Sequence, residues 1–474
     1  MIERSKTHVR YVFMPVLLAL AVSGCSLQPE YQRPELPVTN NYWDHEVRGS
    51  NNASDLDWQQ FFSDPALRQL LQIALVNNRD MQVAALNVES ARAQFHVDRA
   101  ALLPTVSAGA DQTSTRLPGG LYNTQTTGPV TYQQYEANLG ITSWEIDFFG
   151  RLRSLRDQAL ETYLSTEATA KATRISLMGE VASGYLTLCA DSDLLRLAHQ
   201  TADSQRATYE LTRKSYDVGA STAQDLAQAE TTVRSAEADI AQYTRQVRED
   251  TNALRLLLGA ELPAGLVEQA RLERDWGFPD LPAGLPSELL NRRPDIISAE
   301  HTLKAANANI GAARAAFFPT ISLTASGGSA SSSLGHLLEG GTAAWSFAPS
   351  ISVPIFDGGK NRANLDIAEV SKRIEVANYE KSIQTAFKEV SDALAGRATY
   401  KDELKARIQD TDANQRDYDL SLMRFHAGVD DFLDVLVAQR SLYQAQQSLI
   451  TTQLNSLNQQ VTLYKVLGGG WRPD

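Results

Sequence analysis

The sequence predicts a mainly α-helical chain with a membrane β part, built from two internal structural repeats. Three observations support this fold class. A stretch of the first half recurs in the second half, and two spans of more than a hundred residues, 130–262 and 355–472, contain no proline. Four short segments also alternate polar and apolar side chains, as strands with two different faces do.

The repeat appears as ten identities at a constant offset of 215 between residues 80–107 and 295–322. Farther along, residues 211–230 match residues 420–439, with Gly219 opposite Gly428. Each half therefore reads as helix, extended segment, long helix, turn and long helix. We place repeat 1 at 64–260 with a β-hairpin at about 104–148, and repeat 2 at 286–468 with a β-hairpin at about 319–356. The proline-containing segment 261–285 is the linker between them, and 469–474 is a C-terminal tail.

Residues 1–24 are expected to be a lipoprotein signal peptide, because a basic start precedes an apolar run that is too short to span a membrane. The ending Val22-Ser-Gly-Cys25 resembles a bacterial lipobox, in which the mature chain starts at the cysteine and a lipid is attached to its sulfur. Cys25 would then be a membrane anchor, and Ser26 after it favours the outer membrane. The alternative is a plain signal peptide with an incidental cysteine. Residues 25–63 are expected to form an irregular, lipidated N-terminal arm before a helix that Asp64 caps.

Charge and cysteine content exclude several classes of protein. The formal net charge is −12 and becomes −14 once a leader with three basic and one acidic residue is removed, so nucleic acid is not an expected partner. The only cysteine besides Cys25 is Cys189, which excludes an intramolecular disulfide framework in the mature chain. We expect Cys189 to be a buried small apolar residue.

Two helices of almost seventy residues are predicted, from Gly150 to Asp217 and from Gly359 to His426. At 1.5 Å per residue each could extend about 100 Å. Their partner helices carry heptads that predict coiled-coil packing: Leu226, Val233, Ile240, Val247 and Leu254, and in the copy Leu436, Tyr443, Ile450, Leu457 and Tyr464. The remaining faces are polar, which suits the wall of an aqueous space.

Two β-hairpins are predicted from the alternating segments. The outgoing strands begin at Val106 and Ile321, and the return strands run from about Tyr135 to Phe148 and from Trp345 to Phe356. Each strand has roughly the ten residues that a transmembrane strand needs. The connecting loops, 113–131 and 327–344, are rich in Gly, Ser and Thr.

Four strands cannot close a barrel, and unpaired strand edges are costly in a bilayer. Chains must therefore pool their hairpins. Twelve strands from three copies is the smallest symmetric barrel with a lumen wider than a filled eight-stranded one, although a dimer or a tetramer stays open. The long helices would pool likewise into a helical tube.

Two turns join the long helices to their partners, at residues 216–225 and 425–434. Gly219 and Gly428 can each take the left-handed conformation that ends a helix. Ser221 and Gln224 have the spacing of a capping box for the next helix. Asp225 and Asp434 match between the repeats, but other positions differ: Ser215/Arg424, Tyr216/Phe425 and Ser221/Asp430.

No motif of a catalytic, cofactor-binding or metal-binding site occurs: HExxH, CxxC, GxSxG and GxxxxGK[ST] are all absent. We therefore expect no enzyme, no resident metal and no cofactor besides the lipid on Cys25.

Several motifs resemble those of the outer-membrane efflux factors, the TolC-like family, in its lipoprotein (OprM or NodT) branch. They are Trp58-Gln-Gln-Phe-Phe-Ser-Asp-Pro-Ala-Leu67, Arg293-Pro-Asp295, the Arg-Ala-Ala-X-X-Pro-Thr that starts at Arg99 and again at Arg314, Pro354-Ile-Phe-Asp-Gly-Gly359, and Gly428-X5-Asp434. The resemblance covers essentially the whole mature chain. It implies a homotrimer with a shared twelve-stranded β-barrel in the outer membrane and a long antiparallel α-helical barrel in the periplasm. It also implies a periplasmic adaptor (membrane fusion) protein and an inner-membrane RND-type pump as partners, and export of drugs or other small molecules.

By this resemblance the two turns form the periplasmic tip, where the tube nearly closes and the adaptor docks. The implied adaptor contacts are Gly219, Gly428 and Ser221, and the implied gate residues are Asp225, Asp430, Asp434, Tyr216 and Arg424. Copies of one aspartate around a narrow axis would form a negative ring. The alternative is that aspartates in the first turn of a helix serve capping alone.

Two other functions stay open at this point. A lipid-anchored periplasmic coiled-coil scaffold would explain the heptads but not the hairpins. An outer-membrane duct for protein secretion or metal efflux would use the same architecture, although the mature chain has only three methionines for a soft-metal path.

Overall fold

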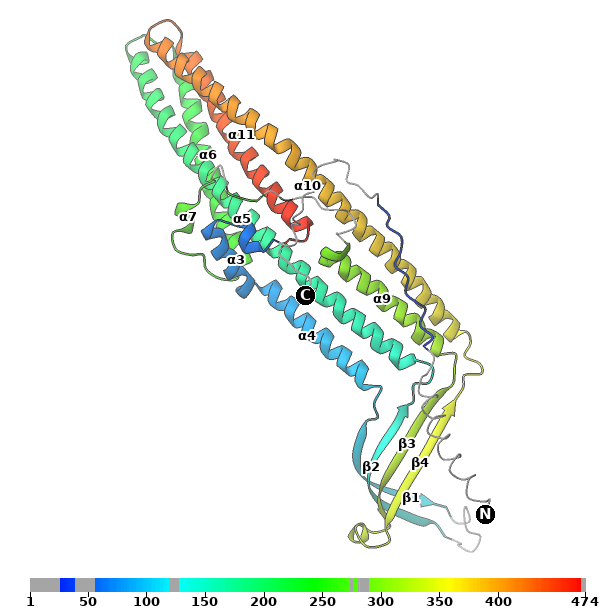
Figure 1. Ribbon diagram of the computed structural model, residues 1–474. Helices are drawn as coiled ribbons and strands as arrows, with labels where there is room; N and C mark the ends of the chain where they lie inside the picture. Colours follow the sequence, from blue (N-terminus) through cyan, green and yellow to red (C-terminus); the bar gives the residue numbers. More distant parts are fainter. Residues whose placement is uncertain are drawn as a thin grey trace. The chain divides into compact units, whose positions relative to one another are not determined.

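The computed structural model describes residues 26–38, 56–118, 128–272, 276–279, 281 and 290–469. Its elements follow one another as α2 (Trp58–Phe61), α3 (Pro65–Asn77), α4 (Arg79–Ala100), β1 (Val106–Leu117), β2 (Val130–Glu145), α5 (Arg151–Asp217), α6 (Ala223–Leu258), α7 (Leu266–Gln269), α9 (Pro294–Ala315), β3 (Thr320–Ser331), the 3-10 helix η2 (Leu334–His336), β4 (Ala343–Ser352), α10 (Lys360–His426) and α11 (Phe432–Val466) (Figure 1). The two helices of 67 residues and both hairpins confirm the predicted order of elements.

The chain forms two compact units, and both repeats contribute to each of them. Unit 1 comprises Met1–Pro34, Val88–Thr166 and Ala299–Tyr379, and unit 2 comprises Glu35–Asn87, Glu167–Ser298 and Glu380–Asp474. A repeat is therefore not a separate domain, since each compact core is assembled from the two copies together.

Unit 1 contains one antiparallel sheet in the order β1-β2-β3-β4. The register places apolar side chains beside one another across all four strands: Val106 lies opposite Ile141, Ile141 opposite Ala325, and Ala325 opposite Phe347. Their neighbours along the strands form the opposite face, where Ser107, Gly140, Ser326 and Ser346 are aligned in the same way. The predicted alternation thus gives the sheet one apolar and one polar face.

The return strands end earlier than predicted. β2 stops at Glu145 rather than Phe148, and its register shifts between Ile141 and Trp144, where Ser143 has a φ of 51°. This β-bulge adds one residue and keeps Trp144 on the apolar face, opposite Leu323. β4 stops at Ser352 rather than Phe356, because its partner β3 begins at Thr320, the residue opposite Ser352.

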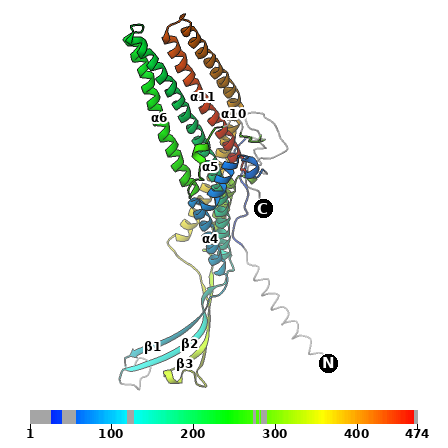
Figure 2. The same ribbon diagram turned by 90° about the vertical axis from the view of Figure 1, so that its left-hand side faces the viewer.

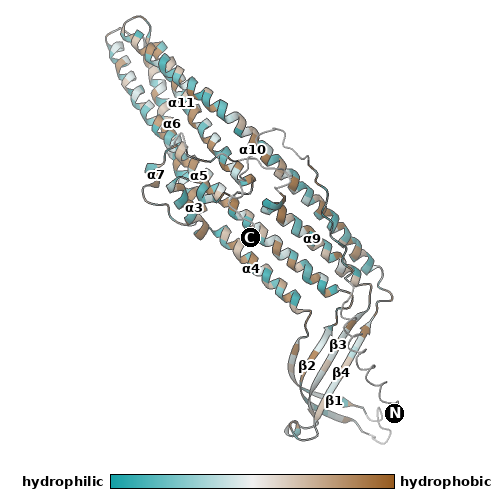
Figure 3. Cartoon of the chain, in the orientation of Figure 1, coloured by the Kyte–Doolittle hydropathy of each residue, from teal (hydrophilic) through white to brown (hydrophobic). Residues whose placement is uncertain are grey.

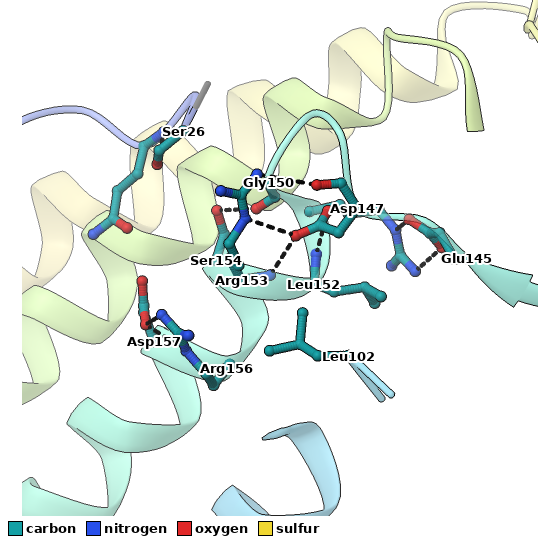
Figure 4. Close-up of polar contacts among 12 residues, drawn as sticks. Ser26, Leu102, Glu145, Asp147, Gly150, Leu152, Arg153, Ser154, Arg156 and Asp157 are labelled. Atoms are coloured by element: carbon teal, nitrogen blue, oxygen red, sulfur yellow. Dashed lines mark hydrogen bonds and ion pairs between the residues drawn. The ribbon is translucent and has the colours of Figure 1, made fainter. Parts of the chain in front are cut away.

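Aspartates precede both long helices. Asp147 accepts hydrogen bonds from the backbone N–H groups of Leu152 and Arg153, at 3.2 and 3.0 Å, at the start of α5 (Figure 4). Asp357 accepts from the N–H groups of Gly359 and Asn361, both at 2.9 Å, before and within the first turn of α10. These hydrogen bonds lower the pKa of Asp357. Each long helix therefore starts at a satisfied N-terminus directly after the sheet.

Unit 2 holds two helical hairpins, in which α6 returns beside α5 and α11 returns beside α10 (Figure 2). None of the ten heptad residues is exposed, and Val233, Val247, Leu254, Leu436, Leu457 and Tyr464 are buried, which confirms the predicted seam. Hydrophilic residues occur along the whole length of the hairpins between the apolar ones (Figure 3).

Aromatic side chains build the core at the foot of the hairpins. Phe61 stacks on Phe278 and on Tyr464, with ring centroids 5.1 and 4.1 Å apart. Phe61 belongs to α2, a short helix that was not predicted, because residues 25–63 were expected to be irregular throughout. Asp64 caps α3 as predicted, accepting from the N–H of Leu67 at 2.6 Å. Cys189 is buried as predicted, and burial raises the pKa of its thiol to about 12.

Candidate functional site at the helix tips

Both helical hairpins of unit 2 turn by the same backbone device. In the first tip, Gly219 has a φ of 75°, and its N–H and that of Ala220 donate to the carbonyls of Tyr216 and Ser215, at 2.9 and 2.8 Å. In the second tip, Gly428 has a φ of 71°, and equivalent bonds of 2.9 and 3.0 Å reach Phe425 and Arg424. The left-handed conformation predicted for the two glycines is therefore confirmed.

The second tip contains an ion pair that the first tip cannot form. The Arg424 guanidinium holds both carboxylate oxygens of Asp430, with Nη2 at 2.7 Å from Oδ1 and Nε on Oδ2. This contact lowers the pKa of Asp430. The repeat-equivalent residues are Ser215 and Ser221, and neither carries a charge. The two substitutions between the repeats therefore give the second tip an ion pair across its turn, which the first tip does not have.

The start of α6 corrects the predicted capping box. The N-cap is Thr222, whose Oγ1 accepts from the N–H of Asp225 at 3.2 Å, while the Asp225 carboxylate accepts from the N–H of Thr222 at 2.9 Å. Ser221 and Gln224 are therefore not the capping pair, because the helix begins one residue later than their spacing implied. The hydrogen bonds from Thr222 lower the pKa of Asp225.

The remaining tip residues are exposed. Tyr216 is 42% exposed, and the structure shows no side-chain hydrogen bond for it among the residues it describes. Asp434 is exposed in the first turn of α11, whose N-cap Asp431 makes no side-chain capping bond. Of the five candidate gate residues, only Arg424 and Asp430 contact each other within one chain. Cys25 lies outside the described residues.

Sequence reasoning missed two groups of polar residues away from the tips. Asn78 and Arg293 lie at equivalent positions of the repeats and bond to the ends of α6 and α11, and their constant offset of 215 could have drawn attention to them. Glu300 holds the N-terminal arm through Arg33. That contact joins residues that are 267 positions apart in the chain, so no local sequence pattern predicts it.

Within the described residues, no group of three or more His, Cys, Asp or Glu side chains is placed to hold a metal ion. Among the helices of that part of the chain, none has the length and apolar composition needed to cross a membrane.

Comparison with known proteins identifies the family. The family model described as outer membrane efflux protein matches residues 70–260 and 285–469. This chain belongs to the outer membrane efflux protein family. It is 48% identical to the probable efflux pump outer membrane protein TtgC of Pseudomonas putida, over 96% of both chains, and 40% identical to the outer membrane protein OprJ of Pseudomonas aeruginosa, over 96% of this chain and 95% of that one.

Solved structures show the same fold. The crystal structure of the open state of the Neisseria gonorrhoeae MtrE outer membrane channel aligns with a TM-score of 0.87 at 38% identity, covering 94% of this chain and 98% of that one. A membrane protein from Pseudomonas aeruginosa aligns with a TM-score of 0.89 at 40% identity, covering 94% and 98%. As a member of the outer membrane efflux protein family, the chain is an outer-membrane efflux channel and not an enzyme, which decides against the coiled-coil scaffold.

Proposed function

We propose that three copies of this chain form the exit duct of a tripartite efflux assembly, with a shared barrel of twelve strands and a shared helical tube. The observation that carries the proposal is the sheet of unit 1. It has one apolar face and two edge strands, β1 and β4, each of which pairs with a single neighbour in the described part of the chain. In a bilayer such edges must be paired, and copies of the same sheet supply complementary edges.

Exposed apolar stripes on the helices of unit 1 support an oligomer. Ile367, Val370 and Ile374, at the spacing of one helix face on α10, are 63, 43 and 52% exposed. α4 has no buried residue along its entire length. In the trimer that we propose, neighbouring copies cover these faces.

We further propose that the helix tips receive a periplasmic adaptor protein, that an inner-membrane pump of the RND type feeds the duct, and that a lipid on Cys25 anchors the arm to the outer membrane. The cargo is a small organic molecule. Relatives named as antibiotic, toluene and solvent efflux proteins, at 47 to 48% identity, support this class of cargo over secreted proteins or metals.

One pair of variants tests the shared barrel. Phe347→Asp places a charge on the apolar face; such a charge costs about 2–4 kcal/mol for a basic side chain at the middle of a bilayer, and less for an acidic side chain or near the bilayer surfaces. Ser346→Asp, its neighbour on the polar face, is the control. We expect Phe347→Asp to reduce the yield of heat-modifiable trimer severalfold and the control to insert and conduct in planar bilayers. Equal loss in both variants, or a wild-type protein that conducts no ions, would contradict the proposed duct.

A further inference from the structure

One face of α9 holds the N-terminal arm against unit 1. Four residues of this face, Glu300, Lys304, Asn307 and Gly311, follow one another at helical spacings of four, three and four, and we call them the arm seat. Asn307 Nδ2 donates to the carbonyl of Pro29 at 2.8 Å. Gly311 admits the arm backbone, because a methyl group there would lie 3.0 Å from the Cα of Gln28.

Charges hold the next part of the arm. The Arg33 guanidinium pairs with both carboxylate oxygens of Glu300, with Nε 3.2 Å from Oε1. Lys304 Nζ lies 3.2 Å from the same carboxylate and 5.4 Å from the centre of the Tyr31 ring. Burial acts to raise the pKa of Glu300, but the hydrogen bond from Arg33 and the charge of Lys304 outweigh it, so the pKa is lowered. The Glu300 side chain is 9% exposed and the Arg33 side chain is 42% exposed, so the carboxylate is largely desolvated while the guanidinium keeps part of its contact with water.

The other repeat has no such seat. The residues at the equivalent positions of α4, found at the offset of 215, are Ala85, Glu89, Arg92 and His96, and all four are exposed. Because the chain has a single N-terminus, only one copy of the duplicated helix has an arm to hold. The seat is thus a specialisation of repeat 2 rather than a feature of the repeated fold.

The seat brings the start of the arm to the place where sheet and helices meet within unit 1. Gly311 lies between Gln28 and Ser154, whose Oγ would be 2.5 Å from a methyl group at position 311. Ser154 donates to the carbonyl of Gly150, directly before α5, at 2.7 Å. Ser26, the first described residue, is drawn beside this first turn of α5 (Figure 4).

We propose that the arm seat fixes the lipid anchor at the junction of strands and helices, so that lipid attachment delivers the hairpins to the membrane surface. This inference rests on the proposed lipidation of Cys25. With the arm seated, Cys25 lies three positions before the contact at Gln28. With the arm released, Cys25 lies 32 positions before Asp57, the cap of α2.

The difference in tether length determines how strongly release of the arm lowers the effective concentration of the hairpins at the membrane. The end-to-end distance of a flexible chain grows as about 5–6 Å times the square root of its length, which is roughly 10 Å for the short tether and 31 Å for the long one. Effective concentration falls as about the −3/2 power of tether length, so release of the arm dilutes the hairpins at the membrane roughly 30-fold. A covalent lipid alone therefore attaches the chain to the membrane, whereas the arm seat also keeps the hairpins close to the membrane surface.

The test follows insertion of the full-length lipidated protein from urea into phospholipid vesicles, read as the rate at which the heat-modifiable form appears. Arg33→Gln with Tyr31→Ala releases the arm without altering the body of the protein, and Glu300→Gln weakens the seat from the other side. Glu89→Gln on the equivalent stripe of α4 is the matched control. Each is made in the lipidated chain and in a Cys25→Ser chain behind a non-lipoprotein signal peptide. Hydrogen exchange of residues 27–34 reports whether the arm is seated.

We expect the arm and seat variants to speed exchange of residues 27–34 and to slow insertion of the lipidated chain by ten- to thirtyfold, with no further slowing in the Cys25→Ser chain. The control should match the parent in both measurements. Equal slowing with and without the lipid would show a merely structural role, and unchanged insertion with a released arm would also overturn the proposal. Conductance of trimers that have already formed tests the proposed duct separately, since the seat takes no part in conduction.

Discussion

Asn78 and Arg293 occupy equivalent positions of the two repeats, and each donates to a carbonyl at the end of a helix from its own half. Asn78 Nδ2 lies 2.8 Å from the carbonyl oxygen of Leu257 in α6, and Arg293 Nη1 lies 3.3 Å from that of Val466 in α11. The last helical carbonyls lack intrahelical partners, so these bonds join the end of one helix to the start of another. We call this side-chain bond between two helix ends a joint. Because it occurs at equivalent positions in both halves, the joint was duplicated together with the helices.

A glycine completes each joint, and replacing it should be costly. Gly259 and Gly468 have φ values of 63° and 75°, and a methyl group would lie 2.4 Å from the Asn77 carbonyl oxygen and 2.7 Å from that of Arg292. We expect Gly259→Ala and Gly468→Ala each to destabilise the folded protein by about 3 kcal/mol, because the strain of a left-handed backbone conformation adds to the backbone clash. Gly219→Ala has the same strain but open space around it, and should cost about 1 kcal/mol. Thermal midpoints at one scan rate check this order, and equal losses at 219 and 259 would refute the clash.

The ion pair of the second tip should restrain the turn. Arg424→Gln or Asp430→Asn removes the contact, and we expect closed-state conductance in planar bilayers to rise severalfold in the trimer. Arg213→Gln, an exposed cation near the first tip with no ion pair among the described residues, should leave conductance unchanged. The lowered pKa of Asp430 sets the pH window: the contact is present above the ordinary carboxyl pKa of about 4 and is lost only as pH falls below it. A wild-type conductance that rises already between pH 7 and 5 would argue against this pair as the restraint.

The first tip should depend on Thr222 rather than on Ser221. Thr222→Ala removes the oxygen that accepts from the N–H of Asp225, a cap worth about 1 kcal/mol. We expect amide exchange in the first turn of α6 to become about fivefold faster, whereas Ser221→Ala should have no effect there. The opposite ranking would restore Ser221 as the cap.

Sequence patterns predicted the elements well where one physical rule operates over many residues. The heptads and the absence of proline located all four long helices, because a packed seam requires that spacing throughout. The ends of β2 could not be predicted in this way, since the bulge at Ser143 lets an extra residue enter without changing which face Trp144 occupies. Alternation alone assigns position 143 to the apolar face, and only the folded sheet shows that Trp144 takes that place instead.

The cap at the first tip shows a second limit. Ser221 with Gln224 and Thr222 with Asp225 both have capping-box spacing, and only the backbone conformation at Thr222 selects between them. The arm seat lies beyond any local pattern, because Arg33 and Glu300 meet only once α9 and the arm are folded. The sequence thus predicted which turns carry the candidate residues, while the pairing of Arg424 with Asp430 became visible only in the folded chain.

A pair of aspartates lies between the helices of the first hairpin. Asp250 on α6 lies close enough to Asp191 on α5 for the two carboxylates to interact, and Oδ2 of Asp250 is buried without a hydrogen-bond partner in the described structure. Burial, followed by the charge of Asp191, raises the pKa of Asp250 to about 7. A carboxyl with a raised pKa binds its proton more tightly in the folded state than in the unfolded state.

Stability from this pair should therefore fall as pH rises from about 4, the unfolded pKa, to about 7, the folded one, and then level off. Asp250→Asn keeps a polar side chain and removes the charge. We expect it to raise the thermal midpoint of the detergent-solubilised protein at pH 8 by about 2 °C, since roughly 1 kcal/mol remains after solvent screening of a half-buried group. At pH 5 the gain should shrink to about a third, because only one of the three pH units between the unfolded pKa of about 4 and the folded pKa of about 7 has then been passed. Glu210→Gln, an exposed acid on α5, controls for net charge and should show no such pH dependence. A gain of equal size at both pH values would mean that Asp250 titrates in its ordinary range, and that the two helices are not held together by a shared proton.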